Sequence, residues 1–182
     1  MEVTWQSIPS ISDLYVRRTP TYIDERGHFQ DIFSCNNLPI EYHMLQSSIS
    51  YSKNNVLRGM HAEAEQTQIV TIIEGRVLEI VLKIDMYAER QIQMHSMILD
   101  SEENNQILLP RGAFHGYHVL SDKAIIHYSS DTLYMPVNQL GVNWKSRQLI
   151  DVWGDIDPLV SNRDYTLPQI DLFIQNNSRS NP

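Results

Sequence analysis

Two histidines stand where a glycine-containing turn meets a predicted strand. His61 ends the segment Arg58-Gly59-Met60-His61, and His115 lies in the segment 110–116, which reads PRGAFHG. A proline and a glycine between strands fix a turn, so the histidine after them begins the next strand. Imidazole is mostly neutral near physiological pH and can accept a proton or bind a divalent metal. The two segments therefore predict a polar site at strand ends.

His115 also completes the PxGxxH pattern of the second cupin motif. The first cupin motif supplies two histidines and a glutamate, and here those places hold His61, Glu63 and Gln68. A metal site would keep the two histidines and lose the ligand at Gln68. The pattern supports a cupin-like fold, and we expect no metal and no other cofactor.

A longer series of segments resembles the sugar-nucleotide 3,5-epimerases, whose best-known member acts on thymidine-diphosphate-4-keto-6-deoxyglucose in rhamnose biosynthesis. The segments occur in the family's order and at roughly its spacing. They are 24–31 (DERGHFQD), 46–52 (QSSISYS), 56–61 (VLRGMH), 109–117 (LPRGAFHGY), 128–136 (YSSDTLYMP), 141–144 (GVNW) and 159–164 (LVSNRD). Together they identify the chain as a divergent member of this family.

The resemblance implies proton transfer at carbons beside a ketone, because a C4 ketone acidifies the C–H bonds at C3 and C5. Inversion needs a base on one face of the sugar and a proton donor on the other. By family analogy His61 is the base and Asp164 holds its other ring nitrogen and stabilises the imidazolium. Tyr128 is the acid on the opposite face, since a phenol of pKa ~10 can donate to an enolate.

The resemblance also implies a set of substrate-binding residues. The arginines suit a diphosphate or the sugar, because guanidinium groups donate paired hydrogen bonds. The set is Arg26, Asp31, Gln46, Ser48, Arg58, Gln68, His115, Tyr134, Gln139 and Arg163. Gln68 replaces a family lysine thought to stabilise the enolate oxygen, and Arg58 is our candidate substitute. Asp31, Ser48 and Gln139 also depart from the family residue.

Three alternatives to a 3,5-epimerase remain. A C3-only epimerase would use the same base with less enolate stabilisation. A non-catalytic protein that binds a nucleotide sugar would follow from the lost lysine at Gln68. A metal-dependent cupin enzyme is the third.

The elements that must position these residues are short and β-branched. The segment 68–84 (QIVTIIEGRVLEIVLKI) contains two apolar blocks around Glu74-Gly75, which predicts a β-hairpin. Further strands are expected at 96–99, 106–109, 116–119 and 124–128. One short helix is expected within 34–44 and a 3₁₀ turn within 151–164, and the tail 176–182 should be frayed.

These elements predict an all-β protein, an antiparallel jelly-roll barrel with short helical or irregular extensions at both ends. One domain should cover residues 1–182, with the motifs in a core at 22–168. The resemblance implies a homodimer that exchanges N-terminal strands.

Composition narrows the partners and the compartment. The net charge of −8 disfavours binding to nucleic acid or an anionic membrane surface. The single cysteine, Cys35, fits a reducing compartment. There is no apolar run of ~20 residues and the N-terminus does not resemble a signal peptide, so we expect a cytoplasmic enzyme of polysaccharide or glycoconjugate synthesis whose partner is a nucleotide-diphosphate sugar.

Overall fold

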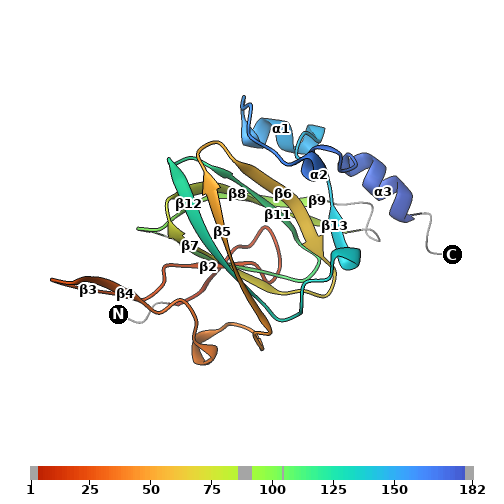
Figure 1. The fold of residues 1–182 in the computed structure, drawn as a ribbon. Coiled ribbons are helices and arrows are strands. Elements are labelled where there is room, and N and C mark those ends of the chain that lie inside the picture. Colours follow the sequence, from red (N-terminus) through yellow and green to blue (C-terminus); the bar gives the residue numbers. More distant parts are fainter. Residues whose placement is uncertain (1–3, 86–91, 104, 179–182) are drawn as a thin grey trace.

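Two antiparallel sheets face each other in the computed structural model, which describes residues 4–85, 92–103 and 105–178 (Figure 1). The six-stranded sheet has the order β1 (Gln6–Ser7), β2 (Tyr15–Arg17), β10 (Gln106–Leu109), β7 (Gln68–Glu74), β12 (Lys123–Ser130) and β5 (Gln46–Lys53). The five-stranded sheet has the order β13 (Gln139–Gly141), β6 (Leu57–Glu63), β11 (Phe114–Val119), β8 (Arg76–Ile84) and β9 (Ile92–Asp100). The predicted antiparallel jelly roll is confirmed.

The predicted strands are found, and most are longer than expected. The segment 106–109 coincides with β10, whereas 96–99, 116–119 and 124–128 are parts of β9, β11 and β12. The added residues join the same ladders although several are polar, such as His95 in β9 and Ser129 and Ser130 in β12.

The hairpin predicted around Gly75 is wrong. β7 pairs with β10 and β12, whereas β8 pairs with β9 and β11, so the two strands lie in different sheets. Gly75 has φ +90°, and a Cβ atom there would lie 2.2 Å from the carbonyl oxygen of Lys123. The turn therefore carries the chain between the sheets, and it needs glycine because both its conformation and its space exclude a side chain.

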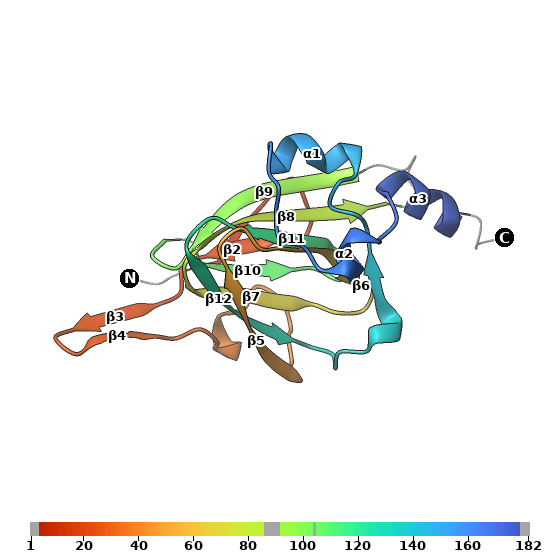
Figure 2. The same cartoon turned by 45° about the horizontal axis from the view of Figure 1, so that its top comes forward.

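The core has two layers. Between the sheets lie apolar side chains that include Val70, Ile72, Val77 and Val81. A second cluster packs the outer face of the five-stranded sheet against α1 (Arg147–Trp153) and α3 (Ile170–Ser178), and the short helix α2 (Asn162–Tyr165) contacts β6 beside them, as Figures 1 and 2 show. Both faces of β8 are covered, which explains its nearly continuous apolar run.

The C-terminal part is more helical than predicted. Two α-helices, α1 and α2, overlap the segment 151–164 where one 3₁₀ turn was expected, and α3 includes residues 176–178 of the expected frayed tail. Leu149, Trp153, Ile170 and Ile174 are buried against the sheet, so packing stabilises helices whose local sequence signal is weak. Residues 179–182 of that tail lie outside the described residues. The expected helix within 34–44 is a 3₁₀ turn, η1 (Cys35–Asn37), and another, η2 (Pro136–Asn138), precedes β13.

A two-stranded hairpin extends away from the barrel (Figure 1). It consists of β3 (Thr21–Asp24) and β4 (Gly27–Gln30), which pair with each other. Tyr22, Ile23 and Phe29 are 64%, 79% and 68% exposed on it. This large apolar surface is uncovered in the single chain. None of the described helices is long and apolar enough to span a membrane.

Candidate active site

A cavity of about 470 Å³ opens between the two sheets. Strand alternation directs polar residues into it: on β5 every second side chain, Gln46, Ser48 and Ser50, lines the wall. All but two of the predicted site residues line this one cavity. They are Gln46, Ser48, Arg58, His61, Gln68, His115, Tyr128, Tyr134, Gln139, Arg163 and Asp164.

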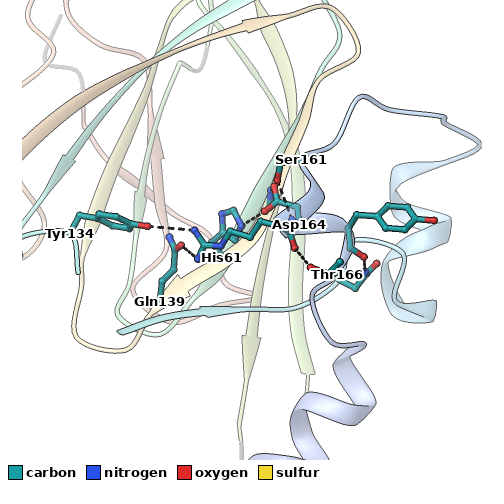
Figure 3. Close-up of polar contacts among 10 residues, drawn as sticks. His61, Tyr134, Gln139, Ser161, Asp164 and Thr166 are labelled. Carbon is teal, nitrogen blue, oxygen red and sulfur yellow. Dashed lines mark hydrogen bonds and ion pairs between the residues drawn. The ribbon is translucent and has the colours of Figure 1, made fainter. Parts of the chain in front are cut away.

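His61 on β6 is held by a carboxylate from α2. His61 Nε2 lies 2.7 Å from Asp164 Oδ1, and the backbone N–H of Gly59 donates to Asp164 Oδ2 at 3.3 Å (Figure 3). Ser161 caps α2 by accepting a bond from the Asp164 backbone N–H at 3.1 Å. Burial opposes ionisation of Asp164, but these bonds and the His61 ring outweigh it and lower its pKa. An ionised carboxylate therefore orients the imidazole.

Tyr128 lies on β12, in the sheet opposite His61. Its hydroxyl is 3.3 Å from Ser50 Oγ, and Ser50 Oγ is in turn 3.1 Å from the hydroxyl of Tyr117. Burial, and next the proximity of Tyr117, raise the pKa of Tyr128 well above 10. The phenol thus keeps its proton and can act as a donor.

His115 is held by a carboxylate that the sequence did not single out. Its Nδ1 lies 2.8 Å from Glu79 Oε1, and the Glu79 side chain is fully buried. Burial raises the pKa of Glu79, and the neighbouring imidazole opposes that shift. His115 lines the cavity, and Glu79 holds its ring from outside the lining.

At the rim, Arg163 donates to Gln139 Oε1 and lies 3.5 Å from the Tyr134 hydroxyl, which links α2 to the first residue of β13 and to the segment before it (Figure 3). Gln46 Oε1 accepts the backbone N–H of Tyr134 at 2.6 Å. On the inner wall Arg58 Nε donates to Ser52 Oγ at 3.1 Å. Two guanidinium groups thus stand at the cavity for an anionic ligand.

Several lining residues were not predicted. Three of them could have been found from strand alternation, because each lies two residues from a predicted site residue on the same strand face. They are Ser50 beside Ser48, Tyr117 beside His115, and Glu63 beside His61. Gln66 and Ser161 lie in turns and offered no such signal. Burial raises the pKa of Glu63.

Arg26 and Asp31 do not reach the cavity in the single chain. Arg26 lies in the β3–β4 turn and pairs with Asp24 at 2.6 Å, and Asp31 follows β4. The hairpin extends away from the barrel that carries His61. The expectation that these two residues bind substrate is therefore not met within one chain.

Across the ranges that the structure describes, no group of three or more His, Cys, Asp or Glu side chains could hold a metal ion. His61 and His115, the two histidines that a metal cupin would keep, each contact a different carboxylate.

Comparison with known proteins assigns the family. The family model described as dTDP-4-dehydrorhamnose 3,5-epimerase matches residues 9–171. The chain belongs to this epimerase family. The predicted resemblance is confirmed, and so is the enzyme class, an isomerase of the sugar-nucleotide epimerase type.

Relatives of the epimerase family match most of the chain. The dTDP-4-dehydrorhamnose 3,5-epimerase of Methanothermobacter thermautotrophicus is 28% identical over 142 residues, 74% of this chain and 76% of its own. That of Shigella flexneri is 27% identical over 163 residues, 85% of this chain and 89% of its own. A dTDP-4-dehydrorhamnose 3-epimerase of Streptomyces niveus is 27% identical over 150 residues, 78% of this chain and 72% of its own.

Solved structures of epimerase family members share the fold. The enzyme from Elizabethkingia anophelis has a TM-score of 0.80 at 27% identity, covering 94% of this chain and 98% of its own. The enzyme from Legionella pneumophila, in complex with dTDP-4-keto-L-rhamnose, has a TM-score of 0.79 at 26% identity, covering 94% of this chain and 93% of its own.

Proposed function

We propose that the chain inverts C3, C5 or both in a nucleotide-diphosphate-linked 4-keto-6-deoxy sugar, and that His61 and Tyr128 move the protons. One observation carries this proposal. His61, which Asp164 holds, and the Tyr128 hydroxyl line the same cavity from opposite sheets, so a sugar ring between them meets a base on one face and an acid on the other.

The steps follow from that arrangement. His61 removes a proton from the carbon beside the ketone, and the electrons of the C–H bond form a C=C bond while the C4 oxygen becomes an enolate oxygen. Tyr128 then gives its hydroxyl proton to the same carbon from the other face. Asp164 stabilises the imidazolium formed in the first step. Proton exchange with water returns both residues to their starting states, and substrate and product have the same formula.

The residues around the cavity supply binding. Arg58 and Arg163 suit the diphosphate or the sugar, and Gln46, Ser48, Tyr134, Gln139 and His115 offer donors and acceptors around them. Relatives with bound ligands support this assignment, since the Legionella pneumophila enzyme holds dTDP-4-keto-L-rhamnose.

The working unit in this proposal is a homodimer of single-domain chains in the cytoplasm, formed by exchange of N-terminal strands. The exposed apolar side chains of the β3–β4 hairpin are the supporting observation, because a patch of this kind is a typical contact surface. A hairpin that crosses to the partner would carry Arg26 and Asp31 to the partner's cavity. The site would then be complete only in the dimer.

The test is proton exchange with solvent. The protein is incubated in deuterated water with thymidine-diphosphate-4-keto-6-deoxyglucose, and label at each carbon is followed by NMR and mass spectrometry. We expect uptake at C3, C5 or both, lost in His61→Ala and retained in His43→Ala, whose exposed ring lies outside the cavity. Saturable binding without uptake would contradict the proposal and identify a non-catalytic binder.

Inversion at C3 alone is the second candidate. Gln68 stands where the family has a lysine, and one relative is named a 3-epimerase. Label confined to C3, with a product inverted only there, would favour this candidate over the 3,5-epimerase.

A further inference from the structure

The enolate oxygen needs a hydrogen-bond donor, and the side chain at position 68 carries no charge. A donor aimed in advance at developing negative charge is often the largest single contribution to catalysis. An amide can donate, but it is useful only if its NH₂ group faces the substrate and its oxygen does not. The orientation of the Gln68 amide is therefore the question.

Gln68 is held by a second glutamine in the same cavity. Gln68 Nε2 donates to Gln66 Oε1 at 3.2 Å. Gln66 Nε2 donates to Thr132 Oγ1 at 3.0 Å and to Glu63 Oε2 at 3.4 Å. Three of these side chains, Glu63, Gln66 and Gln68, line the cavity.

The carboxylate of Glu63 determines which way both amides face, because the Thr132 hydroxyl can either donate or accept. An ionised carboxylate can only accept, so Glu63 requires the nitrogen of Gln66 on its side. The side-chain oxygen of Gln66 then faces Gln68, so Gln68 must donate an N–H of its amide to that oxygen. One of the two Gln68 N–H bonds is used in this contact, and the other remains for a ligand.

The turn that carries Gln66 is hydrogen-bonded to Asp131, the residue that follows β12. The backbone N–H of Thr67 donates to Asp131 Oδ1 at 2.8 Å, and the Asp131 N–H donates to the Thr67 carbonyl at 3.2 Å. Arg111 Nη2 also donates to Asp131 Oδ2 at 3.2 Å. Gln66 therefore starts from a fixed backbone, and its side chain has little freedom to lose on substrate binding.

We propose that Gln66 is a positioning residue that holds the Gln68 amide with one N–H directed at the C4 oxygen of the substrate. The inference rests on the proposed function. Gln68 supplies the hydrogen bond to the ketone, and the bond strengthens as the oxygen becomes an enolate. An oriented dipole thus replaces a cation, and Glu63 and Thr132 act through Gln66.

The test is a double-mutant cycle in the deuterium-exchange assay. Gln68→Leu should lower kcat by roughly 10²-fold, the usual loss of one preorganised donor. Gln66→Met keeps the length and removes the amide, and should lower kcat at least about tenfold with little change in KM, because a small misplacement weakens transition-state contacts most. In the Gln68→Leu background Gln66→Met should change kcat less than about twofold. Gln68→Lys, a cation that needs no amide orientation, should also make Gln66→Met harmless.

Controls separate positioning from folding. Glu65→Ala, an exposed neighbour in the same turn, should leave kcat unchanged. Thr132→Val removes one acceptor of Gln66 outside the cavity and should reproduce a smaller loss in kcat, even if Gln66→Met fails to fold.

The possible results distinguish the positioning role of Gln66 from a structural role. Equal losses from Gln66→Met in the wild-type, Gln68→Leu and Gln68→Lys backgrounds would show a structural role and overturn the inference, as would no loss in any of them. Exchange in the wild type combined with either result would leave the proposed function standing. No exchange in the wild type would overturn the proposed function and this inference together.

Discussion

Asp164 Oδ1 lies 2.7 Å from His61 Nε2, although the two residues are 103 positions apart in the chain. The carboxylate lies on the four-residue helix α2, and the imidazole lies on β6, a strand of the five-stranded sheet. The base is therefore oriented by an element that belongs to neither sheet.

We expect Asp164→Asn to lower the deuterium-exchange rate by roughly 10²–10⁴-fold with the fold intact, because an amide cannot stabilise the imidazolium. Asp155→Asn, which changes an exposed carboxylate just after α1 and outside the cavity, should have no effect. The measurement is label uptake together with circular dichroism. Equal rates in both variants would mean that His61 needs no carboxylate.

Tyr128→Phe should separate the two half-steps. His61 can still remove a proton and return a deuteron to the same face, so label uptake should persist while inversion falls by roughly 10²–10⁴-fold. NMR of the recovered sugar gives both quantities. Parallel loss of uptake and inversion would indicate that Tyr128 does more than donate a proton.

Subunit complementation tests whether the hairpin serves the partner. The Arg26→Ala variant loses the hairpin's contribution to a site but keeps an intact barrel, whereas the His61→Ala variant loses the base in the barrel but keeps an intact hairpin. Mixed and refolded at equal amounts, the two inactive variants should recover roughly a quarter of wild-type activity, since half the dimers are mixed and each of those has one intact site. No recovery, with dimers present by analytical ultracentrifugation, would mean that the hairpin does not complete the partner's site.

Gly75→Ala should lower the free energy of unfolding by at least ~2 kcal/mol, because φ is +90° and the added Cβ would meet the Lys123 carbonyl oxygen at 2.2 Å. Gly112→Ala is the matched control. Its φ is +70° but its nearest contact is 4.0 Å away, so it should cost only about 1 kcal/mol. Urea unfolding measures both, and equal costs would show that space at Gly75 is not the constraint.

The free energy of unfolding should fall as the pH drops below about 6.5. The reason is that His118 is buried and binds a proton less readily in the folded chain than in the unfolded chain. Burial lowers the pKa of His118. The ring lies 2.8 Å from Asn55 Oδ1, and Asn55 Nδ2 donates to the Asp157 carbonyl, so His118 must offer an N–H. The unfolded chain gains the proton first, which costs up to about 1.4 kcal/mol per pH unit until the folded pKa is reached. Urea unfolding at pH 7.5, 6.5 and 5.5 should show a shallower slope in His118→Gln.

Motif spacing predicted most of the cavity because its lining side chains are carried mainly by strands, where alternation is regular, and Asp164 by a short helix. His61, Tyr128 and Asp164 lie in short segments whose order along the chain the fold preserves. Glu79 could not be predicted in the same way: it is a fully buried carboxylate in an otherwise apolar stretch of β8, and only the pairing of β8 with β11 brings it to His115.

Two other features depend on long-range packing. The turn at Gly75 reads locally as a hairpin, and only the partners of β7 and β8 reveal a crossing between sheets. The helices α1 and α3 are short, and the sheet that they cover supplies the stability that their sequences lack.

The late position of α2 has a consequence for truncated chains. The described strands end with β13 at Gly141, and residues 157–159 lie against Asn55 and Val56 through a hydrogen bond and a parallel bridge. A chain that stopped at Ser161 would contain all these strands and the Tyr128 wall, yet it would lack the carboxylate that orients His61. Premature termination there would also remove Arg163 from the cavity, and Ile170 and Ile174 from the outer face of the five-stranded sheet, so the last tenth of the chain serves the base, the anion site and the packing of the barrel at once.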